Sequence, residues 1–499
     1  MKNTRVYIWS VILGLTLCVP AVRGQRPDPQ SNPPLQPLQP DSPPPAGEIT
    51  GTAPGQTLPR PETQATPDTR PLSGAEQFTL GQMGKRRNYL LTNFDFFQSA
   101  DTNPIVSPQP RLDTESTLFG YLALRRIWSH YEFKTEYTGG GQLYVHNSNL
   151  DATIQEFGME LRIGGRRWSA LLTDQVSDIP ESLFSFSGFG TTEGNLQFGG
   201  FGSAQSIQNT DITNLNAIFE PDQSILTTRS SRLANTGVAE LDYNLSRKST
   251  FTAAAGYGIL RFNNSSVTGS FVNNDNAVFL AGYDYVPNVR NTLAVSYGLT
   301  LFRYPGQAQQ IYDHVVALDY RYQITGRLAL ELSAGPEFYT ISHAVTGPGQ
   351  HSQFSSYQQI SLMYSTLGRT TLRISYFNFL TGGAGVVSGA NSHTVELTVA
   401  HHWSRSWSSS LDTGFAHSTP LAQTNLGAAN LRPFNTWYGS ATLSRPLGRY
   451  MDLLFDYTVQ RQISGTTGTS LCAIAICGLA PARQVFGLGF DWHRPQIPL

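Results

Sequence analysis

Excess charge of either sign is missing from this 499-residue chain. Its 34 Lys and Arg side chains almost balance its 35 Asp and Glu side chains, and charged residues make up only 14% of the sequence. Nucleic-acid-binding proteins usually carry a basic excess. The composition therefore gives no indication of a nucleic-acid partner.

Long apolar runs are missing after the first residues. Beyond Val6–Val19, nothing approaches the roughly 18 apolar residues that indicate a transmembrane helix. That run follows basic residues and precedes small ones, which is typical of a signal peptide, and we expect cleavage after Gly24 to remove residues 1–24. The alternatives are an uncleaved anchor, for which the run is short, and a lipid anchor at Cys18, before which Leu17 is not a small residue.

Cysteines are few. Without Cys18, only Cys472 and Cys477 remain. An even number of cysteines in an exported chain favours one disulfide. The alternative is a fragment of a metal site, but no further ligand lies nearby in the sequence.

Motifs of catalytic chemistry are also missing. The sequence has no Gly-x-Ser-x-Gly elbow, no His-Glu-x-x-His and no Walker loop. The adjacent His401 and His402 would point to opposite faces of a strand, which disfavours a shared metal ion. We therefore expect no enzyme activity, no catalytic or metal site and no cofactor.

The segment 25–87 is rich in Pro, Gln, Thr and Asp. Such a segment cannot bury enough apolar surface to offset its ordering entropy, and it favours extended, polyproline-like conformations. We expect a disordered periplasmic tail that acts as a spacer. The alternative is a tether that contacts the cell wall or a periplasmic partner.

From residue 88 onward, segments of roughly 10 residues alternate apolar and polar side chains, as strands that face lipid on one side and water on the other do. The clearest is Ile311 to Gln323, and Met451 to Gln460 and Glu156 to Ile163 repeat the pattern. These segments are about twice the average strand length of soluble proteins. They match the roughly 9–11 tilted residues that cross a bilayer.

Short and long connections alternate along the chain. Short turns are expected near residues 127–129, 164–165, 247–248, 287–290, 325–326, 367–368, 404–406 and 447–448. Long connections are expected near residues 98–115, 138–151, 174–233, 263–274, 304–310, 341–353, 380–390 and 418–433. With a first strand at 88–97 and a last one at 483–493, this order predicts about eighteen strands, with sixteen as the alternative, and places both ends on the short-turn side.

This organisation resembles the bacterial porin-type outer-membrane barrels. The resemblance implies an all-β fold over residues 88–499, a transmembrane, antiparallel up-and-down barrel in contact with outer-membrane lipid and inserted by the barrel-insertion machinery. Many such barrels end on an aromatic residue. Here a final apolar face, Phe486, Leu488, Phe490 and Trp492, is followed by residues 494–499.

Placing the polar face of each segment inward predicts the side chains that line the lumen. They are Glu132, Lys134, Glu136, Glu156, Glu160, Arg162, Glu240, Asp242, Asp313, Asp319, Arg321, Arg327, Glu331, Glu337, Arg373, Glu396, Asp452, Asp456 and Asp491. Acidic members predominate, which leads to the hypothesis of a cation-biased pore. The alternative is that these charges pair across strands and keep the wall hydrated.

The connection 174–233 is much the longest and contains five phenylalanines next to glycines: Phe184, Phe186, Phe189, Phe198 and Phe201. Loops of this length are usually functional or disordered. One hypothesis is that it folds into the barrel mouth and narrows it. The alternative is a mobile flap that faces outward.

A barrel of about eighteen strands is too wide for its own side chains to fill. The sequence therefore favours an outer-membrane channel for small hydrophilic solutes, either monomeric or as a homo-oligomer. The alternatives are an export conduit for a polymer such as an exopolysaccharide, and a non-conducting adhesion or structural barrel. A TonB-coupled transporter is disfavoured, because residues 25–87 are too short and too polar for a folded plug.

Overall fold

The computed structural model describes residues 88–104, 110–181, 230–262, 273–305, 309–342, 351–366, 369–382, 389–404, 406–421, 433–464, 482–493 and 497–498. The predicted signal peptide, the predicted tail and both cysteines lie outside these residues. Among the described residues, no helix is long and apolar enough to span a bilayer.

The described part of the chain is almost entirely β-strand. The strands are β1 (Tyr89–Asp101), β2 (Asp113–Ile127), β3 (Tyr131–Tyr144), β4 (Ala152–Gly164), β5 (Trp168–Glu181), β6 (Ser230–Asn244), β7 (Ser249–Phe262), β8 (Asn274–Asn288), β9 (Asn291–Arg303), β10 (Gln310–Thr325), β11 (Leu328–Ser342), β12 (His351–Thr366), β13 (Thr370–Thr381), β14 (Ala390–His402), β15 (Ser408–Pro420), β16 (Phe434–Pro446), β17 (Met451–Ser464), β18 (Arg483–His493) and the short β19 (Ile497–Pro498). A 3-10 turn, η2 (Ser148–Leu150), lies between β3 and β4.

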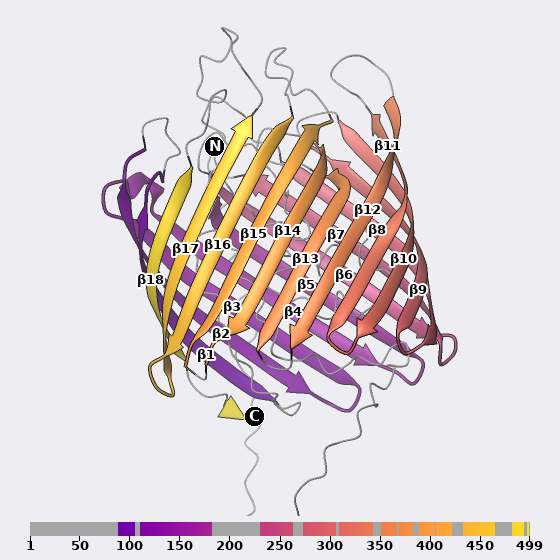
Figure 1. Ribbon diagram of the computed structural model, residues 1–499, viewed down its shortest axis with the longest axis horizontal. Coiled ribbons are helices and arrows are strands. Elements are labelled where there is room, and N and C mark those ends of the chain that lie inside the picture. Colours follow the sequence, from indigo (N-terminus) through magenta and orange to yellow (C-terminus); the bar gives the residue numbers. More distant parts are fainter. Residues whose placement is uncertain are drawn as a thin grey trace, which may run out of the picture. The chain divides into compact units, whose positions relative to one another are not determined.

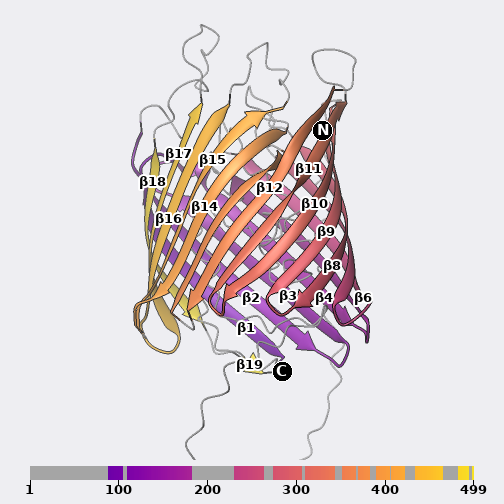
Figure 2. The same ribbon diagram turned by 45° about the vertical axis from the view of Figure 1, so that its right-hand side comes forward.

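The strands form one antiparallel sheet that closes on itself (Figures 1 and 2). Each long strand pairs with the next along the chain, and β18 pairs with β1 from Asn93↔His493 to Asp101↔Val485. The short β19 pairs with the start of β1. The predicted eighteen-stranded up-and-down barrel is therefore confirmed, and sixteen strands is wrong.

The register shows how strongly the strands tilt. Following directly paired residues once around the sheet returns to β1 about 22 residues beyond the starting point, the stagger that a tilted barrel needs in order to close. With a rise of about 3.3 Å per residue and strands about 4.8 Å apart, this stagger gives a tilt of about 40° and a backbone diameter of about 35 Å.

The outer face of the barrel is apolar. Its exposed large side chains include Phe94, Leu118, Phe157, Leu241, Phe279, Val295, Leu318, Ile374, Phe415, Phe455 and Leu488. The alternate positions face inward and are mostly small and polar, including Thr117, Thr138, Ser177, Thr236, Ser296, Ser361, Ser375, Thr394 and Thr458. This distribution is the reverse of that in a soluble protein, and it is the distribution that a barrel surrounded by lipid requires.

Seven of the eight predicted short turns lie between consecutive strands at one end of the barrel (Figure 1), and the eighth, 367–368, lies outside the described residues, between the ends of β12 and β13. Several predicted long connections are shorter than expected, including 174–233, where β5 continues to Glu181 and β6 starts at Ser230. β1 continues to Asp101 and β2 starts at Asp113, while β3 runs through Gly139–Gly141 to Tyr144. At Gly140, any side chain would meet the Leu118 carbonyl oxygen of β2, so glycine is required there for the strands to pair.

Candidate functional site

The inward face of the barrel carries nearly all the side chains predicted to line the lumen. Those predicted residues that are buried are Glu136, Glu156, Glu160, Glu240, Asp242, Asp313, Glu337, Glu396 and Asp491. Those that are half-buried are Glu132, Lys134, Arg162, Asp319, Arg321, Glu331, Arg373, Asp452 and Asp456. The alternation along each strand therefore places these groups on one continuous wall.

Arg327 is an exception, because it lies in the exposed turn between β10 and β11 and not on the wall. The turn lies at residues 326–327 instead of the predicted 325–326, so Arg327 belongs to the connection and β11 starts at Leu328. Alternation counted strictly along the sequence assigns Arg327 to the inward face.

The basic side chains on the wall contact acidic neighbours. Arg125 donates to Glu132 at 2.8 Å and Lys134 contacts Glu136. Arg162 pairs with Glu160, and Arg321 donates from Nε to Glu331 at 2.6 Å. Arg125–Glu132 and Arg321–Glu331 join neighbouring strands, as the alternative of pairing across strands expects, whereas Lys134–Glu136 and Arg162–Glu160 each lie within one strand.

A second group of carboxylates has no such partner. Asp284 of β8 and Asp319 of β10 both lie opposite Ala294 of β9, and Asp242 lies on the same face of β6. Within the described segments, no Lys or Arg forms an ion pair with Asp242, Asp284 or Asp319. Hydroxyl groups partly satisfy them, since Thr252 donates to Asp242 at 2.8 Å and Ser296 to Asp319 at 2.9 Å. The wall therefore carries three carboxyl groups without a basic partner, one on each of β6, β8 and β10.

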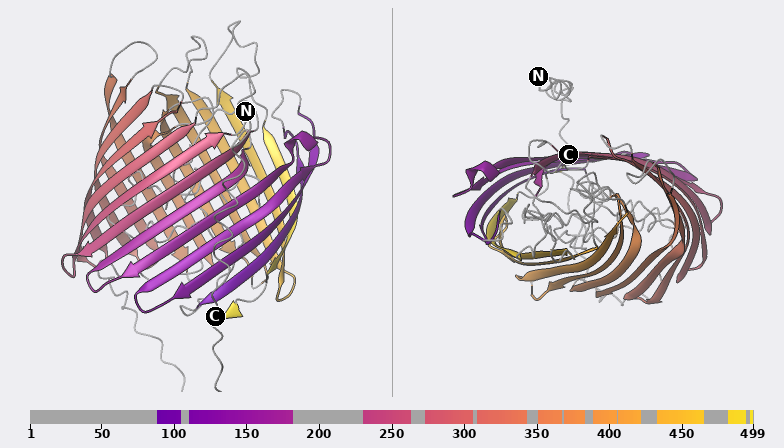
Figure 3. Two further views of the ribbon diagram at one scale, coloured as in Figure 1. Left: turned by 180° about the vertical axis from the view of Figure 1, so that it is seen from behind. Right: turned by 90° about the horizontal axis from the view of Figure 1, so that it is seen from above.

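The barrel wall is interrupted near its long-connection end. β12 pairs with β11 over Leu328↔Tyr364 to Ile341↔His351, but its pairing with β13 stops at Gln358↔Asn378. Beyond that point β13 continues with β14 up to Thr381↔Ala390. The view from above in Figure 3 shows the orange strands in this part of the chain curving into the barrel.

Side-chain contacts hold the outer end of β13 inside the barrel. The Asn378 amide donates to the Ser356 carbonyl oxygen at 2.9 Å, where the strand ladder has ended. The Leu380 backbone N–H donates to the Glu337 carboxylate of β11 at 3.2 Å. Past the strand, the Tyr304 hydroxyl donates to the Gly382 carbonyl oxygen at 2.7 Å. Burial raises the pKa of the Tyr304 hydroxyl above its ordinary range, so this group stays a donor.

Apolar packing confirms that the outer end of β13 crosses the inner face of the barrel wall. By alternation Leu380 should point outward, yet it is 1% exposed, because it packs against inward side chains of β9, β10 and β11: Phe302, Ile311, Tyr339 and Ile341. On the other face of β13, Phe377 and Phe379 belong to one buried cluster with apolar side chains of β6, β7, β8, β10 and β12. The inner surface is thus narrowed by β13 itself.

Gly389, at the start of the return into β14, fits this packing closely. Its φ of 82° is a conformation that L residues rarely adopt, and a side chain there would meet the Ile311 side chain at 2.6 Å. Its N–H donates to the Gly382 carbonyl oxygen at 3.1 Å. Glycine at this position therefore allows the chain to turn while it touches β10.

Two predicted features lie outside the described residues. These are the Phe-rich constriction segment with Phe184, Phe186, Phe189, Phe198 and Phe201, and the cysteine pair Cys472 and Cys477. The narrowing by β13 is a separate feature that sequence reasoning missed.

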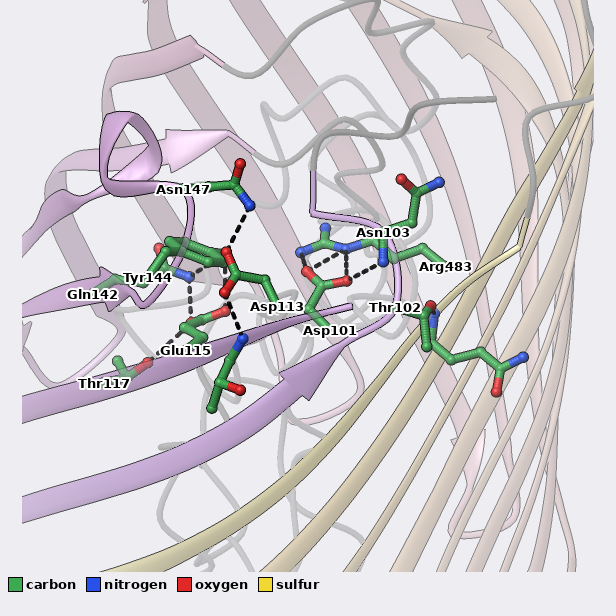
Figure 4. A network of polar contacts seen from close by, with 12 residues as sticks. Asp101, Thr102, Asn103, Asp113, Glu115, Thr117, Gln142, Tyr144, Asn147 and Arg483 are labelled. Carbon is green, nitrogen blue, oxygen red and sulfur yellow. Dashed lines mark hydrogen bonds and ion pairs between the residues drawn. The ribbon is translucent and has the colours of Figure 1, made fainter. Parts of the chain in front are cut away.

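Several inward acidic side chains are not among the residues predicted to line the lumen. Asp284 and Asp412 lie between outward residues and follow the alternation, so the period-2 pattern could have found them. Asp101, Asp113 and Glu115 fall in what was expected to be a long connection. There they form a network at the outer ends of β1, β2 and β3 (Figure 4). The Glu115 carboxylate accepts from Tyr144 at 2.9 Å, and Asp113 accepts from Asn147 at 2.6 Å.

Comparison with known proteins gives similarity to solved structures only. No protein-family model matches the chain, and no curated protein matches it. The Pseudomonas aeruginosa OpdQ structure is 9% identical, covering 83% of this chain and 100% of that one, with a TM-score of 0.41. The FrpB iron transporter from Neisseria meningitidis is 8% identical, covering 82% and 70%, with a TM-score of 0.43.

Pseudomonas aeruginosa OccK2 in complex with glucuronate is 10% identical, covering 81% of this chain and 97% of that one, with a TM-score of 0.39. Such low identities and TM-scores define neither a family nor a substrate for this chain.

Proposed function

We propose that this protein spans the outer membrane of a Gram-negative bacterium and passes small hydrophilic solutes through a cation-preferring lumen. The observation that carries the proposal is the inverted barrel, with large apolar side chains outside and polar or charged ones inside. A closed barrel satisfies the backbone polar groups in lipid, where open sheet edges are not tolerated. The apolar outer face and the polar wall fit lipid outside and water inside.

The orientation follows from the connections. In barrels of this type, short turns face the periplasm and long loops face outward. β13 leaves β12 at Gln358↔Asn378, toward the long-connection ends of both strands.

Small solutes are favoured over a polymer because β13 narrows the inner surface. Cations are favoured because the carboxylates on β6, β8 and β10 have no basic partner, whereas the basic wall residues stand beside acids. Rings of acidic side chains select cations in channels.

The reversal potential of the refolded full-length protein tests this proposal in planar bilayers under a KCl gradient. We expect discrete conductance steps and a reversal potential of the sign for K⁺ preference. Preference for Cl⁻ would contradict the cation bias. A folded, inserted protein without conductance would favour the adhesion or structural barrel.

A further inference from the structure

Three neighbouring strands place an inward aspartate at one level near the short-turn ends of β17 and β18. Asp95 of β1 lies directly opposite Asp491 of β18, and Asp491 lies directly opposite Asp452 of β17. His493, two residues after Asp491, shares the inward face. Its Nδ1 lies 3.6 Å from the Asp491 carboxylate and 3.9 Å from that of Asp452.

This arrangement has little positive charge to balance it. Like charges directly opposite each other destabilise a strand pair. In the described ranges, His493 is the one side chain that forms an ion pair with Asp452 or Asp491, and it is charged only when protonated. One potential ligand atom from each of Asp452, Asp491 and His493 falls within 4.8 Å of the others.

Asn93 supplies an independent observation. It lies directly opposite His493 on the inward face of β1 and is 0% exposed, yet neither its Oδ1 nor its Nδ2 has a hydrogen-bond partner. The buried Asp491, on the same face, also has an unpartnered Oδ1. Buried polar atoms are rarely left without a partner, because their desolvation is then uncompensated. Directly opposed side chains are close neighbours, so the Asn93 amide points into the space beside His493.

We propose that Asp452, Asp491 and His493, with the Asn93 amide oxygen beside them, bind a divalent transition-metal ion of the Zn²⁺ class. Ligand atoms that each lie about 2.0–2.1 Å from a tetrahedral Zn²⁺ are roughly 3.4 Å apart. The separations of 3.6 and 3.9 Å from the imidazole to the two carboxylates need to shorten by only a few tenths of an ångström. An imidazole among carboxylates favours Zn²⁺ over Mg²⁺ or Ca²⁺, which prefer oxygen ligands alone.

The ion would tie β1, β17 and β18 together at the periplasmic end of the seam between the first and last strands. Asp452 and His493 are partly exposed on the inner face, so an ion can reach them from the lumen. The site lies on β1, β17 and β18 and includes no residue of β13.

Titration calorimetry of the refolded full-length barrel with ZnCl₂ in a non-chelating buffer tests the site, together with thermal unfolding with and without Zn²⁺. We expect one Zn²⁺ per chain and a higher Tm with the metal. D491N and H493Q should weaken binding by more than about tenfold. D456N is the matched control, because Asp456 is an inward carboxylate of β17 outside the cluster, and it should bind Zn²⁺ like the wild type.

N93D keeps the proposal falsifiable if the other variants fold poorly. It replaces the Asn93 amide with a third anionic ligand, so it should tighten Zn²⁺ binding. Absence of Zn²⁺ binding by the folded wild type would overturn the proposal. So would unchanged affinity in H493Q or N93D, since His493 would then act only as an ion-pair partner of the aspartates.

Discussion

Arg483 and Asp101, 382 residues apart in sequence, form a buried ion pair across the seam that closes the barrel. The Arg483 Nε donates to the two Asp101 carboxylate oxygens at 3.1 and 2.9 Å, and a terminal guanidinium nitrogen donates to one of them as well. Asp101 also accepts the Asn103 backbone N–H at 2.9 Å. Asp101 ends β1 and Arg483 begins β18, so the pair fixes the outer end of the seam (Figure 4).

Replacement of Arg483 by Met should strongly destabilise the barrel. It would leave the Asp101 carboxylate buried without its counter-charge, which costs about 3–5 kcal/mol. Urea unfolding of the folded barrel in lipid measures this loss. R125M is the control, because the Arg125–Glu132 pair is partly exposed and such pairs contribute less than about 1 kcal/mol. The double variant D101L/R483M should recover most of the loss, and equal effects of R483M and R125M would contradict the prediction.

Replacement of Leu318 by Arg should test which face of β10 meets lipid. Leu318 is an exposed outward residue, and an arginine facing the middle of a bilayer costs about 2–4 kcal/mol. Q323R, on the inward face of the same strand, should cost much less because its guanidinium stays in water. The free energies of unfolding in phospholipid vesicles compare the two. Similar losses in both variants would argue against an outer face in lipid.

Neutralising the unpaired carboxylates should reduce ion selectivity. In D242N/D284N/D319N, amides of nearly the same shape replace three inward carboxyl groups that have no basic partner. We expect the K⁺/Cl⁻ permeability ratio to fall by about half or more, because acidic rings set cation preference. D174N is the control, since Asp174 faces outward on β5 and should leave the ratio unchanged. An unaltered reversal potential in the triple variant would place selectivity elsewhere.

Removing the Tyr304 hydroxyl should loosen the inward-folded end of β13. In Y304F the Gly382 carbonyl oxygen keeps only the Gly389 N–H as a donor, and loss of the Tyr304 hydrogen bond costs about 0.5–1.5 kcal/mol. We expect a larger or more variable single-channel conductance. Y297F provides a matched control, because the Tyr297 hydroxyl contacts His314 on the outward face. Identical conductance traces for Y304F and the wild type would show that β13 does not limit passage.

The sequence predicted most of the wall because its signals are local. Alternation in Ile311–Gln323 placed Asp313 and Asp319 inward correctly, and turn residues located the short connections. The same counting placed Arg327 wrongly, because the turn between β10 and β11 lies one residue later than predicted and includes Arg327.

Other features depend on contacts between distant strands. Nothing near Leu380 in the sequence indicates that it leaves the outer face, since its burial depends on Phe302 and Tyr339. The partner of Asp101 could not be identified before the register of β18 against β1 was known. The acidic site of Asp452 and Asp491 was recognised as part of the lumen wall, but its cluster with His493 arises only when the barrel closes.

Closure by the two chain ends also constrains how the protein can be made. β1 gains β2 as a neighbour early in synthesis, but its other edge has no partner until β18, at the far end of the chain, has been made. Unpaired edges recruit other chains, and pairings between such distant segments form slowly. The nascent protein therefore needs its β1 edge shielded until the last strand arrives, and a chain truncated before Arg483 should aggregate rather than form a smaller barrel.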